Sequence, residues 1–83
     1  MRKDEYLKIR KFMKSICLDN VLEICEVVGL TEYETNLMIH VNKNNTRVYS
    51  SLDLGICTSK FSKDCHKVFT KIRDYLKRNN IQY

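Results

Sequence analysis

The sequence predicts an all-α fold, a compact bundle of five helices in one domain. Apolar residues recur three and four positions apart along most of the chain, as they do on the buried face of a helix. Only two Gly and no Pro occur, too few turn formers for a β-sandwich or barrel. A chain of 83 residues buries only about 60 to 65% of its unfolded surface and cannot support a second core. Multidomain enzymes are therefore excluded.

Two helices are predicted in the first 28 residues. The first runs from Arg2 to Cys17, with a basic face opposite its apolar positions. Those apolar positions are Tyr6, Ile9, Phe12, Met13 and Ile16, with Leu7 beside them. Asp19 or Asn20 can cap the second helix, which stops at Gly29, a residue suited to the left-handed position that closes a helix. Its apolar surface comprises Val21, Leu22, Ile24, Cys25 and Val28.

A capping box marks the third helix, because the Thr31 hydroxyl and the Glu34 carboxylate can each satisfy a backbone N–H of its first turn. Its inward residues are Leu37, Met38 and Val41. The polar cluster 42–45 is rich in turn formers and predicts a loop. Thr46 or Asn45 can then cap a fourth helix of about two turns. Its inward residues are expected to be Val48, Ser51, Leu52 and Leu54, and it ends at Gly55.

The fifth helix, about residues 58–76, is predicted to be the longest. Its apolar positions repeat over several turns: Phe61, Cys65, Val68, Phe69, Ile72, Tyr75 and Leu76. The opposite face carries a base on nearly every turn.

The net charge of +5 is unevenly distributed. Residues 1–20 hold six bases and three acids, residues 21–41 hold four acids and no base, and residues 42–83 hold nine bases and three acids. A polyanion bound on one face would explain this segregation, and so would a Lys-rich surface that is only solvated. Composition leaves both interpretations open.

A short helix, a three-residue turn and a longer basic helix are typical of a helix-turn-helix. Gly55 allows a left-handed exit from the fourth helix, and Ile56 anchors the turn, so the start of the last helix stays exposed. A DNA major groove accepts short polar and basic side chains there. The candidate groove-facing residues are Thr58, Ser59, Lys60, Ser62, Lys63 and His66, with specificity expected from Ser59, Lys60, Ser62 and Lys63. The candidates for positioning phosphates are Lys43, Arg47, Lys67 and Lys71.

Three marks give the stretch from Leu30 to Leu76 a family resemblance. Residues 30–34 are similar to an L-[ST]-x-x-E opening, residues 54–56 to an L-G-I turn, and residues 71–72 to a K-[IL] ending. The stretch thus resembles the C-terminal domain of bacterial sigma factors and the sigma-like regulators of bacteriophages of Gram-positive hosts. The resemblance implies recognition of duplex DNA by the last helix and a role in transcription.

The chain departs from that family at two positions. Cys57 stands where a Ser or Thr cap is usual, and Thr58 could cap instead. Ser50 stands where the family usually has a buried Ile, so either Val48 and Leu52 supply that contact or the register is shifted by one.

Together these features predict a small sequence-specific DNA-binding regulator of transcription, of phage or mobile-element type. Residues 30–79 would bind duplex DNA, while residues 1–28 would pack, form a homodimer or contact a host protein such as RNA polymerase. A second hypothesis is a small interaction protein that modulates a host regulator or nucleic-acid enzyme through its basic face or its acidic patch of Glu23, Glu26, Glu32 and Glu34. A third is the DNA-binding subunit of a phage packaging terminase, which assembles into rings.

No catalysis, cofactor or metal is expected. Cys65, His66 and Asp64 are neighbours on a helix, so their side chains point about 100° apart and cannot act together. The four cysteines form two pairs, each with an eight-residue spacing, and lack the C-x2-C knuckle of structural zinc sites. We interpret Cys17, Cys25, Cys57 and Cys65 as reduced, buried thiols.

A cytoplasmic location without membrane contact is expected. No run of eighteen apolar residues occurs in the chain. The first ten residues alternate charged with apolar side chains, where a signal peptide would need an uninterrupted apolar core.

Overall fold

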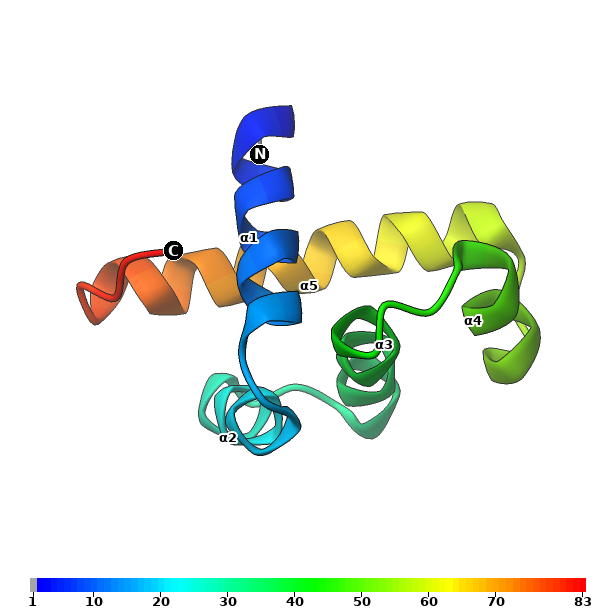
Figure 1. The fold of residues 1–83 in the computed structure, drawn as a ribbon, viewed down its shortest axis with the longest axis horizontal. Helices are drawn as coiled ribbons and strands as arrows, with labels where there is room; N and C mark the ends of the chain where they lie inside the picture. Colours follow the sequence, from blue (N-terminus) through cyan, green and yellow to red (C-terminus); the bar gives the residue numbers. More distant parts are fainter. Residues whose placement is uncertain (1) are drawn as a thin grey trace.

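The computed structural model describes residues 2–83 and is all-α, as predicted. Its helices are α1 (Lys3–Ser15), α2 (Leu18–Val28), α3 (Glu32–Asn42), α4 (Arg47–Leu54) and α5 (Thr58–Arg78). Figure 1 shows α5 along the longest axis, with α1 crossing its middle, α2 and α3 beneath it, and α4 at its first turns. Within residues 2–83 no helix is long and apolar enough to span a bilayer.

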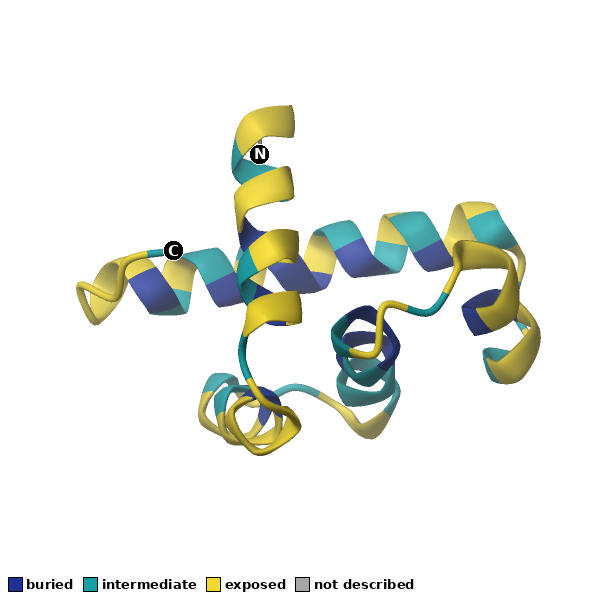
Figure 2. Ribbon diagram, in the orientation of Figure 1, coloured by how far each residue is buried: buried dark blue, intermediate teal, exposed yellow. Residues whose placement is uncertain are grey.

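One apolar core joins four of the helices. The buried residues are Ile9 and Met13 of α1, Val21 and Cys25 of α2, Leu37, Met38 and Val41 of α3, and Phe61, Cys65, Val68, Phe69, Ile72 and Leu76 of α5. Figure 2 shows these buried positions on the inward side of each helix. The three-and-four spacing therefore identified the buried face of α5 correctly, and α1 and α2 belong to the same core as the rest of the chain.

The predicted caps of α3 and α4 are confirmed. The Glu34 amide donates to Thr31 Oγ1, and the Thr31 amide donates to Glu34 Oε1, each at 3.1 Å. Thr46 Oγ1 accepts from the Tyr49 amide at 3.1 Å and caps α4. Gly55 closes α4 in the left-handed conformation with φ of 69°, where a side chain would be strained. The chain can therefore reverse direction sharply into α5.

The expected caps of α2 and α5 are wrong. Cys17 and Cys57 occupy the two N-cap positions in extended conformation, and neither side chain caps its helix. Thr58 is already the first helical residue of α5. A thiol is a weak acceptor, so it does not replace the hydroxyl or carboxylate of an ordinary cap. Helix α1 ends at Ser15 rather than Cys17, and α2 begins at Leu18. The two caps expected from sequence, Asp19 and Asn20, therefore lie inside α2.

The inward face of α4 agrees with the prediction only in part: Ser51 is buried and Leu54 packs against the core as expected, but the other two positions are wrong. Val48 and Leu52 are 61% and 76% exposed, whereas Ser50 and Ser51 are buried. The Ser50 hydroxyl donates to the Thr46 carbonyl at 2.9 Å, and the Ser51 hydroxyl donates to the Arg47 carbonyl at 2.7 Å. Because α4 satisfies both hydroxyls itself, they can be buried at little cost. Val48 and Leu52 therefore do not replace the buried Ile of the sigma family.

Two polar contacts tie α3 to its neighbours. Asn42 Nδ2 donates to the carbonyls of Met13 at 2.9 Å and Ile16 at 2.8 Å, and so satisfies the end of α1. The His40 ring is buried between two partners. Its Nε2 lies 2.8 Å from Asp53 Oδ2, and its Nδ1 lies 2.9 Å from Asn45 Nδ2. A neutral ring with its proton on Nε2 satisfies both partners, because the amide of Asn45 can donate to Nδ1.

The four thiols fall into two classes. Cys25 and Cys65 are buried as expected, but Cys17 and Cys57 are exposed because they lie in the linkers before α2 and α5. Burial raises the pKa of the Cys65 thiol to about 12, although the positive charge of Arg10 acts in the opposite direction. Burial likewise raises the pKa of Cys25. Cys25 and Cys65 are therefore both protonated and sheltered at neutral pH.

We expect Ellman's reagent at pH 8 to react quickly with two thiols of the native protein and with the other two only after unfolding. Replacing Cys17 and Cys57 by Ser should abolish the fast reaction, because only exposed thiols meet the reagent. Four equally fast thiols would contradict the burial of Cys25 and Cys65.

Candidate nucleic-acid interface

The outward face of α5 carries a short stripe of polar and basic side chains. Ser59, Lys63 and Lys67 follow one another at intervals of four, so they share one face of the helix, and all three are exposed. We call them the outer stripe. On the opposite side Phe61, Cys65 and Phe69 are buried and hold the helix to the core. The first turns of α5 therefore present this face to solvent.

Lys60 and Lys71 lie on the flank of α5 that faces α3, where both are engaged. Lys60 Nζ is 2.9 Å from Asp64 Oδ2, and Lys71 Nζ is 2.8 Å from Glu34 Oε2. The Tyr33 hydroxyl donates to Asp64 at 2.6 Å, and the Lys60 ammonium lies 5.7 Å from the centroid of the Tyr33 ring. Hydrogen bonds from Tyr33 and then Lys60 lower the pKa of Asp64, so its charge is retained. Both lysines are thus paired with a carboxylate of the same molecule, although about half of each side chain is exposed.

Other candidate residues lie away from the outer stripe. The His66 ring stacks on Tyr6 of α1 with centroids 5.7 Å apart, so it is half-buried beneath α1. Lys43 lies at the end of α3 and lines a separate hollow of about 460 Å³ between α3 and α4. Thr58 and Ser62 are half-buried at the start of α5. The structure therefore brings only part of the predicted set onto one surface.

A second basic feature lies between α1, the start of α4 and α5. It is a hollow of about 200 Å³ with Arg10, Lys14 and Arg47 among its lining residues, and we call it the basic cleft. The other lining residues are Tyr6, Val41, Asn45, Phe61, Ser62, Cys65 and Phe69. Of these ten residues none is acidic, and the ion pairs found within residues 2–83 use none of the three bases. The cleft thus concentrates positive charge.

Arg10 and Lys14 were missed as candidate site residues. A signal is present in hindsight, because Tyr6, Arg10 and Lys14 are spaced by four and share one edge of α1. Only the packing of α1 across α5 brings that edge next to Arg47 and Ser62.

The electrostatics of Tyr6 agree with this placement. Burial, and next the neighbouring Cys65, raise the pKa of the Tyr6 phenol, while Arg10 and Arg47 act to lower it. Two guanidinium groups from different helices are therefore close enough to influence the same phenol oxygen.

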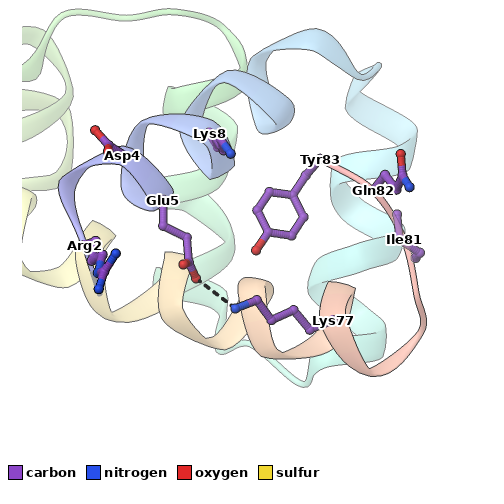
Figure 3. Close-up of a pocket in the computed structure, with 8 residues that line it drawn as sticks. All are labelled: Arg2, Asp4, Glu5, Lys8, Lys77, Ile81, Gln82 and Tyr83. Atoms are coloured by element: carbon purple, nitrogen blue, oxygen red, sulfur yellow. Dashed lines mark ion pairs between the residues drawn. The ribbon is translucent and has the colours of Figure 1, made fainter.

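The hollow on the other edge of α1 has a different character. Figure 3 shows its lining, in which Asp4 and Glu5 mix with Arg2, Lys8 and Lys77. Glu5 Oε1 lies 3.4 Å from Lys77 Nζ and 3.2 Å from an Arg73 nitrogen. This hollow is larger, at about 550 Å³, but two carboxylates stand among its three bases, and Glu5 pairs with Lys77. Its lining therefore carries less positive charge than that of the basic cleft.

No family model, curated protein or solved structure matches this chain. The outer stripe and the basic cleft are the two surface features that bear on function.

Proposed function

We propose that the chain is a small regulator of transcription that binds duplex DNA, with α4 and α5 acting as a helix-turn-helix. The observation that carries the proposal is the exposure of the outer stripe while the opposite face of α5 is buried in the core. A B-DNA major groove is about 12 Å wide and admits a single α-helix. Ser59 would meet base edges, and Lys63 and Lys67 would contact the flanking phosphates.

The geometry around Gly55 supports this role. The left-handed bend and the short turn after it leave the start of α5 at one end of the molecule, next to α4 (Figure 1). Val68, Ile72 and Leu76 anchor the later turns, so the exposed first turns are held rigidly. A reading helix must be held in this way, because base contacts tolerate little movement.

We propose that two copies act together. A single small module neutralises few phosphates, so groove-reading domains of this size commonly pair on two half-sites. The apolar side chains of Leu18, Leu22 and Val27 are exposed on α2 and are available for such a contact. Light scattering on the free protein and on its DNA complex measures the number of copies and separates dimers from the rings of a terminase-like subunit.

The test of DNA binding is the loss caused by K63A/K67A. Fluorescence anisotropy with a labelled duplex of about 20 base pairs should show roughly tenfold weaker binding at 100 mM salt, and a slope of log K against log[salt] that is smaller by about two. K8A/K11A is the matched control, because it also removes two positive charges, but from residues of α1 that belong to neither the outer stripe nor the basic cleft. This variant should bind like the wild type.

Circular dichroism must show that both variants remain folded. Equal losses in the two variants would indicate unspecific attraction to a basic protein, and a wild type without affinity at 50 mM salt would overturn the proposal.

A protein partner is the second candidate, favoured by one observation. Val48, Tyr49 and Leu52 are exposed together on two turns of α4. Apolar side chains grouped in this way often mark a contact with another protein. If the wild type does not bind duplex DNA, an interaction protein becomes the better-supported function.

A further inference from the structure

The basic cleft gathers three cations from two distant parts of the sequence. Arg10 and Lys14 come from α1, and Arg47 is the first residue of α4. Like charges that converge without a carboxylate repel one another, so the arrangement favours an anion between them. The N-terminal end of α4 adds to this effect, because the helix dipole is positive there.

The chemistry of the lining suits a phosphate group. A guanidinium group offers two parallel N–H donors that match two oxygens of a phosphate. Tyr6 and Ser62 are also among the lining residues, and each carries a hydroxyl group that can donate to a phosphate oxygen. The buried Phe61 and Phe69 also border the cleft, and apolar neighbours strengthen charged hydrogen bonds by lowering the local dielectric constant.

The size of the cleft limits what can enter. A water molecule takes up about 30 Å³, so a hollow of about 200 Å³ holds a phosphate group with a few waters.

The position of the cleft fits a duplex that also meets the outer stripe. Ser62 lines the cleft and is the neighbour of Lys63, so the two surfaces adjoin along the first turns of α5.

We propose that the basic cleft is a phosphate-binding site, filled in the DNA complex by a phosphodiester of the duplex backbone. The inference rests on the proposed function and extends it, because α1 becomes a second DNA-contacting element beside α5. Phosphate contacts set the orientation of a protein on DNA. Arg10, Lys14 and Arg47 would thus fix how α5 enters the groove.

Two measurements on R10Q/R47Q test the cleft, with K8Q/K11Q as the matched control. In the first, inorganic phosphate is titrated into the wild type at constant ionic strength, and NMR follows the Nε–Hε signals of the arginines. The signals of Arg10 and Arg47 should move, and those of Arg2 and Arg78 should not. In the second, R10Q/R47Q should bind the labelled duplex roughly tenfold more weakly, with a salt slope smaller by about two.

The outcomes separate the cleft from the proposed function. If R10Q/R47Q binds duplex like the wild type while K63A/K67A does not, the cleft inference is overturned and DNA binding stands. If phosphate moves the arginine signals but the wild type binds no duplex, the cleft serves a free phosphate compound, and both the backbone assignment and the proposed function fall. R10K/R47K keeps the charges and guards against misfolding, and it should recover part of the lost affinity.

Discussion

Replacement of Phe69 by alanine is expected to lower the free energy of unfolding by about 3–5 kcal/mol. Phe69 is the largest of the fully buried side chains, and its ring packs edge-on against Tyr6 with centroids 5.1 Å apart. Its loss would leave a cavity where α1 crosses α5. A small domain has only about 5–15 kcal/mol of stability in total, so a large fraction of the variant should be unfolded at 37 °C.

Urea unfolding followed by circular dichroism measures this loss. Phe12→Ala is the matched control, because Phe12 is only half-buried and packs at the edge of the core. It should cost distinctly less, since less apolar surface returns to water. Similar losses in the two variants would show that α1 does not pack on α5 as described.

Replacement of Asn42 by aspartate is expected to destabilise the protein by about 3–5 kcal/mol at pH 7, more than replacement by alanine, which should cost about 1–3 kcal/mol. The Asn42 amide donates to two carbonyls at the end of α1. An ionised carboxylate has no proton to donate and would face both carbonyl oxygens, so the contact becomes repulsive. Alanine removes the donors without adding a charge.

The aspartate variant should also depend on pH in a defined direction. The fold disfavours the ionised form of the new carboxyl, so the extra loss is greatest at neutral pH and shrinks as acid protonates it. Urea unfolding of the variant and the wild type at pH 7 and pH 4 gives the difference. Asn20→Asp, at an exposed position on α2, is the control and should show no such penalty. A penalty for N42D that does not change with pH would contradict the donor role of Asn42.

Local rules accounted for the helices but not for every helix face. The capping box of Thr31 and Glu34 and the left-handed Gly55 act within one turn of the chain, so the sequence predicts them well. The inward face of α4 was predicted correctly for Ser51 and wrongly for Val48 and Leu52, because a helix of eight residues has too few apolar positions to fix its rotation. Only the packing shows that Ser50 faces inward.

The candidate site was predictable in part, for a related reason. Lys63 and Lys67 belong to one continuous helix, so helical spacing alone places them on one face. The engagement of Lys71 depends on Glu34, a residue 37 positions earlier in the chain. The basic cleft likewise needs Arg10 and Arg47 to be brought together by the fold. Contacts of this kind leave no periodic signal in a single sequence.

The core shared by α1, α2, α3 and α5 restricts how this chain can evolve. New regulators often arise when a DNA-binding domain that folds on its own is fused to another protein. Here α5, the helix that would touch DNA, packs in a core that includes Ile9 and Met13 of α1, and Asn42 of α3 holds the end of α1 through two hydrogen bonds. Replacement of residues 1–30 would therefore remove part of the core on which α5 packs and would destabilise that helix.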